Sequence, residues 1–123
     1  MKARFIFVMY IVIVSTDVAA TEVAKDYWVG AMKTALPATF CKADQFFRQC
    51  FDVTVDECEK TVALATRLCL HKYINQIPDT LIQPKDGAKW ANIIGQCVGE
   101  SSKESLVTKY RDSHRCRDID HWK

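Results

Sequence analysis

The sequence contains little glycine and little proline, with four and three of them among 123 residues. Turn-rich β-structures such as sandwiches and barrels need these residues at short, regular intervals. The chain also lacks internal repeats and low-complexity segments. These absences argue against an all-β or a repeat architecture, and they favour a fold made mainly of helices.

Neither sign of charge dominates the chain, which carries 17 Lys and Arg residues against 15 Asp and Glu residues, a formal net charge of +2. Proteins that bind nucleic acid through phosphate contacts usually concentrate basic side chains on one face. No such basic run occurs here. We therefore expect no nucleic-acid partner.

Sequence motifs of common enzyme classes are also absent: there is no G-x-S-x-G, no phosphate-binding glycine loop and no C-x-x-C. Three histidines could serve as acids or bases, His71, His114 and His121, but His71 has no carboxylate one turn away and the other two stand in a polar tail. We predict no catalytic residue, no cofactor and no metal. A secreted hydrolase or toxin is kept as the last alternative.

The first twenty residues have the layout of a secretory signal peptide. Lys2 and Arg4 precede an unbroken apolar run over 5–14, and Val18 and Ala20 occupy the small-residue positions of a cleavage site. A membrane anchor is the rival interpretation, but ten apolar residues make only about 15 Å of helix against ~30 Å of hydrocarbon. We expect cleavage after Ala20, a single domain over 21–123, no stable membrane span after cleavage, and a secreted or periplasmic location.

All six cysteines lie beyond this segment, at 41, 50, 58, 69, 97 and 116. An even number of cysteines in a small exported chain is typical of a disulfide framework. Structural zinc sites use closer ligand pairs, usually C-x2-4-C, whereas the gaps here are longer. If Cys58 and Cys69 share one continuous helix, they lie about 16 Å apart along its axis, too far to share an ion. The sequence therefore predicts disulfides.

Apolar residues recur at helical spacing along most of the chain. The clearest start is at Thr54, which with Glu57 forms a capping-box pattern. We expect an all-α, disulfide-stapled bundle of four to five helices, with an αα-hairpin over about 43–77 at its centre. The expected helices are 21–37 (closed by Pro37), 43–51, 54–77, 87–99 (ended by Gly99) and 101–113 (started by a Ser101–Glu104 box), with an irregular connection over 78–87.

The hairpin model also predicts which cysteines pair. Folding the chain back at Thr54 places Cys50 opposite Cys58, and Cys41 opposite Cys69, as two rungs across the hairpin. The remaining two cysteines then pair by elimination. The predicted disulfides are Cys41–Cys69, Cys50–Cys58 and Cys97–Cys116.

A stapled scaffold without catalytic motifs is typical of a binding protein. We expect an exported, non-enzymatic protein-binding module of the inhibitor, immunity or adaptor type, whose partner is another extracytoplasmic protein; a homodimer is compatible with this. The predicted interaction surface is the 78–87 connection, with Leu81 and Ile82. The alternative is a carrier that holds a small apolar ligand in an inter-helix cavity, lined by Phe46, Phe47, Tyr73, Trp90 and Ile94.

Overall fold

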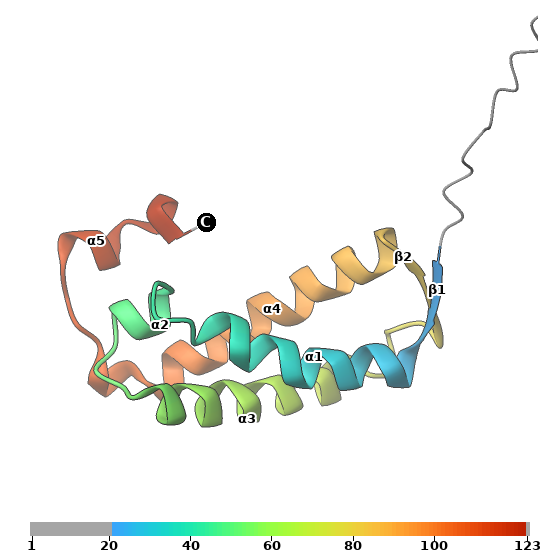
Figure 1. Ribbon diagram of the computed structural model, residues 1–123, viewed down its shortest axis with the longest axis horizontal. Helices are drawn as coiled ribbons and strands as arrows, with labels where there is room; N and C mark the ends of the chain where they lie inside the picture. The colour runs from blue at the N-terminus through green and yellow to red at the C-terminus, as the bar shows by residue number, and fades with distance from the viewer. Residues whose placement is uncertain (1–20, 123) are drawn as a thin grey trace, which may run out of the picture.

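The computed structural model describes residues 21–122, which are mainly helical (Figure 1). The predicted signal peptide, 1–20, lies outside the described residues. The elements in order are β1 (Thr21–Ala24), α1 (Lys25–Phe40), α2 (Phe46–Gln49), α3 (Val55–Tyr73), β2 (Thr80–Gln83), α4 (Lys85–Ser105), η1 (Val107–Lys109), α5 (His114–Arg117) and η2 (Ile119–Trp122). The predicted fold class, a small all-α bundle stapled by disulfides, is confirmed.

Three long helices form the main body of the molecule, and α3 packs against both α1 and α4. The space between them is filled by aliphatic side chains that are fully buried, among them Val62, Ile94 and Val98. Burial of side chains of this size contributes roughly 1.5–3 kcal/mol each. The two strands lie at one end of the body, and α2 and α5 lie at the other (Figure 1).

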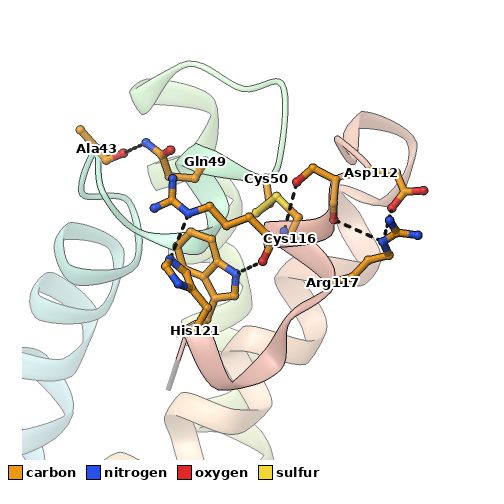
Figure 2. Close-up of a disulfide and its surroundings, with 10 residues drawn as sticks. Ala43, Gln49, Cys50, Asp112, Cys116, Arg117 and His121 are labelled. Carbon is orange, nitrogen blue, oxygen red and sulfur yellow. Dashed lines mark hydrogen bonds and ion pairs between the residues drawn. A yellow bond between two sulfur atoms is a disulfide. The ribbon is translucent and has the colours of Figure 1, made fainter.

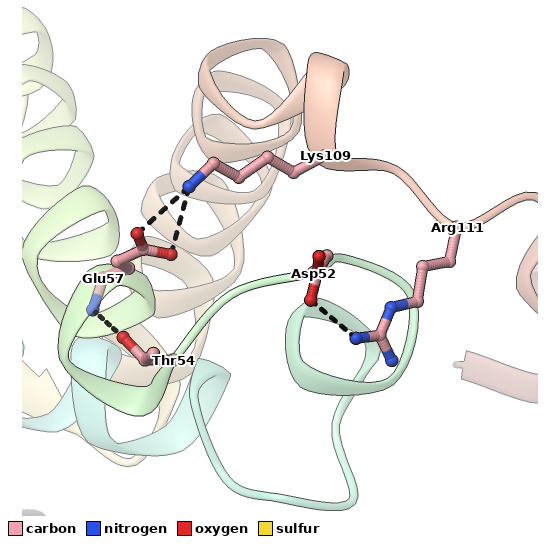
Figure 3. A network of polar contacts seen from close by, with 5 residues as sticks. All are labelled: Asp52, Thr54, Glu57, Lys109 and Arg111. Carbon is pink, nitrogen blue, oxygen red and sulfur yellow. Dashed lines mark hydrogen bonds and ion pairs between the residues drawn. The ribbon is translucent and has the colours of Figure 1, made fainter.

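Helix α3 begins where the sequence predicts. The hydroxyl of Thr54 accepts a hydrogen bond from the backbone N–H of Glu57 at 3.1 Å, which satisfies one of the free donors of the first turn (Figure 3). The reciprocal half of the capping box is replaced by another contact, because both carboxylate oxygens of Glu57 accept from Lys109 Nζ at 3.1 Å. The first turn of α3 is therefore tied to the segment after α4.

Two predicted helix boundaries near the N-terminus were wrong. Residues 21–24 form a strand that pairs antiparallel with β2, in the register Thr21 to Gln83 and Val23 to Leu81, so part of the predicted irregular connection is also a strand. Helix α1 continues past Pro37 to Phe40. Pro37 is buried, and this packing outweighs the backbone hydrogen bond that proline cannot donate.

The predicted break at Gly99 was also wrong, since α4 runs without interruption to Ser105. The buried stripe of α4 includes Ile94 and Val98 and extends to Ser102, so the residues on both sides of Gly99 pack on the same core. That packing outweighs the cost of about 1 kcal/mol for glycine inside a helix. The predicted helix start at Ser101 is consequently absorbed into α4.

The predicted hairpin over 43–77 is present only in reduced form, because its first arm contains a single helical turn, α2. Beyond α2 the chain turns away: Phe51 forms an isolated antiparallel bridge with Tyr110, and the Arg111 N–H donates to the Cys50 carbonyl at 2.8 Å. The long neighbours of α3 are therefore α1 and α4. This difference changes the cysteine pairing.

The three predicted disulfides were all wrong. The structure contains Cys41–Cys58, Cys50–Cys116 and Cys69–Cys97, with Cα–Cα distances of 5.8, 5.6 and 5.9 Å. Cys58 and Cys69 do lie on the buried side of α3, as the helical spacing predicts. Their partners come from two different helices, since Cys41 caps α1 and Cys97 lies within α4. The last bridge, Cys50–Cys116, ties the tail to the end of α2 (Figure 2).

Candidate functional site

The predicted interaction surface over 78–87 is only partly available. Leu81 is fully buried, because its strand position turns the side chain into the core, opposite Val23 of β1. Its neighbour Ile82 points the other way along the strand and is 49% exposed. The interaction residue predicted at Leu81 is therefore a core residue, and Ile82 remains accessible.

The five residues of the predicted apolar pocket do not surround one cavity. Ile94 is fully buried and Trp90 nearly so, and the ring of Trp90 lies 6.5 Å from that of Tyr73, between centroids. Phe46 and Phe47 belong to α2, where they join a different group of rings. The prediction of a single inter-helix cavity was therefore wrong.

Phe46 and Phe47 instead border a hollow next to the C-terminal tail. Phe46 contacts Phe47 and Trp122 edge to face, with centroids 5.4 and 5.5 Å apart. The hollow has a volume of about 300 Å³. We call it the aromatic hollow, and its lining residues are Phe40, Gln45, Phe46, Phe47, Gly99, Lys103, Cys116, Ile119 and Trp122. Two of the five predicted pocket residues thus line a hollow, but at another place.

The tail that closes this hollow is held by local contacts. Ser113 caps the α5 turn by accepting from the Cys116 N–H at 3.1 Å, and Trp122 Nε1 donates to the Arg115 carbonyl at 3.0 Å. The Arg115 guanidinium lies over the Trp122 ring and donates to His121 Nε2 at 3.0 Å. Together with Cys50–Cys116, these contacts fold residues 113–122 back onto α2 (Figure 2).

The other two histidines, His71 and His114, are exposed. Within residues 21–122, no group of three or more His, Cys, Asp or Glu side chains is placed to hold a metal ion. Over the same range, no helix combines the length and the apolar character needed to cross a bilayer.

A further candidate surface lies on α3, on the side away from the core. Leu64 and Leu68 are one turn apart there and remain 55% and 58% exposed. Lys60, Arg67 and His71 are exposed around them, and Lys60 forms an ion pair with the exposed Asp56. We call the two leucines and these three basic residues the outer face of α3.

Lys60 and Arg67 are the cationic side chains of this face. Lys60 Nζ forms a hydrogen bond and an ion pair with Asp56 at 2.8 Å, and this contact raises the pKa of the Lys60 ammonium above its usual value. Arginine is always charged. The outer face of α3 therefore presents two leucines beside Arg67 and the Lys60–Asp56 ion pair.

Sequence reasoning missed both the outer face of α3 and the role of the tail. The leucine pair had a visible signal, since two apolar residues four apart fall outside the buried stripe of Cys58, Val62 and Cys69. No sequence signal indicated that Trp122 and Ile119 line the aromatic hollow. Their position depends on the Cys50–Cys116 pairing, which only the fold establishes.

The fold and its three disulfides define a class of small helical proteins built for an oxidising compartment outside the cytosol. Residues 22–110 match the family described as the type II secretion system substrate NttA, and the chain belongs to that family. It is accordingly an extracytoplasmic protein. The match ends before Cys116 and the rest of the folded tail. Comparisons with curated proteins and with solved structures gave no match.

Proposed function

We propose that this protein leaves the cell and acts there as a non-enzymatic binding module, with the outer face of α3 as its contact surface for another protein. The observation that supports this is the exposure of Leu64 and Leu68 on a helix whose opposite side carries two disulfide-bonded cysteines. A partner with an apolar groove and an acidic rim complements this surface.

The energetics favour a rigid helix as the binding element. Peptide and protein grooves commonly recognise helices through apolar anchors at i and i+4. Completing the burial of two half-exposed leucines would contribute roughly 1 kcal/mol each. Because Cys58 and Cys69 fix α3 to α1 and α4, little additional conformational entropy is lost on binding.

The basic side chains of this face have a separate role in this proposal. Lys60 and Arg67 are exposed, so their attraction to acidic groups is weakened by solvent and contributes mainly to the rate of association. A surface of this kind would suit an inhibitor, an immunity protein or an adaptor. We propose no catalytic role, since His71 and His114 stand in solvent rather than in a water-excluding cleft.

The location can be tested by cell fractionation. The family consists of type II secretion system substrates, so we expect the mature protein in the culture medium of a wild-type strain. In a strain without that secretion system, we expect it in the periplasm. Equal amounts in the medium of both strains would contradict this part of the proposal.

The binding surface can be tested with the variant Leu64→Ser/Leu68→Ser. Both side chains are exposed, so the fold should be retained and the thermal unfolding midpoint nearly unchanged. Partners captured from the native compartment by the disulfide-intact protein are identified by mass spectrometry and then purified. The double variant should reduce their affinity at least 10-fold.

The control is Tyr27→Ser/Val107→Ser, which removes two exposed apolar side chains that do not belong to α3. It should leave the affinity within 2-fold of wild type. Lys60→Gln/Arg67→Gln should slow association and weaken its salt dependence. The proposal is wrong if the leucine variant and the control bind every purified partner equally well.

A further inference from the structure

The aromatic rings of the hollow come from three separate segments of the chain. Phe40 ends α1, Phe46 and Phe47 belong to α2, and Trp122 closes the tail. The rings meet edge to face, with the centroid of Phe47 lying 5.8 Å from that of Phe40. These rings form the apolar walls of the hollow. Its volume of about 300 Å³ is at the small end of the usual range of ligand sites, ~300–1,000 Å³.

Helix α4 provides the backbone side of the hollow at Gly99. A Cβ atom built on Gly99 would meet no atom within 4 Å, so the space in front of this position is open. Glycine in a helix interior is less favourable than alanine. Here it allows a bound group to approach the helix backbone closely. A side chain at this position would start from open space at the border of the hollow.

The polar character of the lining selects the kind of ligand. Its one charged residue, among the described residues that line it, is Lys103, whose Nζ lies 5.9 Å from the centroid of Phe46. Aromatic faces attract cations, but Lys103 already supplies a cation at this ring. A cationic ligand would be repelled by Lys103, and an anionic one would pair with it. Gln45 adds an amide at the border of the hollow.

We propose that the aromatic hollow is a binding site for a small apolar molecule that carries a carboxylate. Its hydrocarbon part lies against the rings of Phe46, Phe47 and Trp122, and its carboxylate reaches the ammonium of Lys103. This site is independent of the outer face of α3, since the two share no residue. Three of its lining residues, Cys116, Ile119 and Trp122, also lie beyond the part of the chain that matches the family.

The ligand class is tested on the wild-type, disulfide-bonded protein by isothermal titration calorimetry. The probes are 4-phenylbutyrate, 4-phenylbutanol and 4-phenylbutylammonium, which share a phenyl ring on a four-carbon chain and carry an anionic, a neutral and a cationic end group. We expect the carboxylate to bind about 2- to 5-fold more tightly than the alcohol at low salt, a range typical of one exposed ion pair. The ammonium should bind more weakly than the alcohol. Equal affinity for all three, or a preference for the ammonium, would overturn the proposal.

The position of the site is tested with Gly99→Leu and its control Gly30→Leu. Both glycines lie in helices and have open space in front of them, but Gly30 is exposed on α1 and does not line the hollow. Gly99→Leu should fill the hollow and weaken 4-phenylbutyrate binding at least 10-fold, with an unfolding midpoint at or above that of wild type. Gly30→Leu should bind within 2-fold of wild type. If both variants bind like wild type, the ligand is elsewhere and the proposal fails.

Two further measurements keep the test decisive if Gly99→Leu does not fold. The indole N–H resonance of Trp122 should shift on addition of 4-phenylbutyrate, because the ring that carries this N–H lines the hollow. Lys103→Gln should remove the preference for the carboxylate over the alcohol. An unshifted indole resonance at saturation, or an unchanged preference in Lys103→Gln, would each contradict the proposed site.

Discussion

The body of the molecule, α1, α3 and α4, and its tail end, α2 with residues 106–122, are stabilised differently. In the body, branched aliphatic side chains such as Val62 and Ile94 are fully buried, and two disulfides join the three helices. The tail end uses aromatic rings, several of them only partly buried, one disulfide and exposed ion pairs. The aliphatic side chains of the body are closely packed. The rings of the tail end border the aromatic hollow. The chain thus combines a tightly packed helical body with a tail end that is less completely packed.

The largest expected difference between these regions is the cost of truncating a side chain. Ile94→Ala removes a fully buried side chain from the body and should lower the free energy of unfolding by about 3 kcal/mol, within the usual ~2–5 kcal/mol. Trp122→Ala removes a half-buried ring from the tail end and should cost less than about 1 kcal/mol. Urea denaturation of the two oxidised variants measures both values. Equal losses would show that the tail end is packed as tightly as the body.

The next comparison concerns the disulfides. Removing Cys69–Cys97 with a double alanine variant should cost about 3 kcal/mol, because the bridge restricts the unfolded chain over a separation of 28 residues. The Cys50–Cys116 bridge spans 66 residues, so the same entropy model assigns it a larger effect, ~4 kcal/mol. We expect the measured loss of stability to be smaller, under about 2 kcal/mol. Without the bridge the tail can detach from the folded protein, so the native state gains conformational entropy as well as the unfolded state.

Hydrogen exchange shows whether removing the Cys50–Cys116 bridge frees only the tail or destabilises the whole fold. In Cys50→Ser/Cys116→Ser, amides of residues 113–122 should lose protection, while those of α3 and α4 keep theirs. A loss of protection throughout the body would mean that the tail disulfide supports the whole fold.

A smaller effect of opposite sign is expected at Ser102. Its side chain is fully buried in the body, and its hydroxyl has no hydrogen-bond partner among the described residues. Ser102→Ala should raise the free energy of unfolding by about 1 kcal/mol, because an unsatisfied buried polar group is removed and alanine favours the helix. The control Ser101→Ala, at a partly exposed position, should gain only the helix-propensity part, about 0.5 kcal/mol. Calorimetry that ranked the two gains equally would contradict the assignment.

Small effects are also expected where the body meets the tail end. Thr54→Ala removes the N-cap of α3 and should cost about 1 kcal/mol. Lys109→Ala breaks the ion pair with Glu57 (Figure 3). The side chains of Lys109 and Glu57 are 43% and 46% exposed, so the loss should be less than about 0.5 kcal/mol. High salt should reduce the second difference and leave the first. If Lys109→Ala costs more than Thr54→Ala, the link to the tail is stronger than an exposed pair allows.

Local features of the fold could be predicted from particular residues. Thr54 followed by Glu57 predicted the start of α3, and the helical spacing of Cys58, Val62 and Cys69 predicted its buried side. Predictions failed where the structure of a segment depends on contacts with segments distant in sequence. Pro37 and Gly99 do not end helices, because tertiary packing outweighs their local cost. Leu81 is buried because residues 21–24 pair with its strand, a contact between segments far apart in sequence.

The sequence by itself was sufficient to predict that the protein is extracytoplasmic, mainly helical and contains six paired cysteines. Helical spacing is a local property of the sequence, and the number of cysteines is a property of its composition. Only the tertiary structure decided which cysteines bond. Helical periodicity predicts the side of α3 on which Cys58 and Cys69 lie, but their disulfide partners depend on which helices pack next to α3. The tertiary structure also placed Trp122 against Phe46 and so formed the aromatic hollow. The physical reason is the same in both cases: a contact between distant segments depends on the packing of all the helices together.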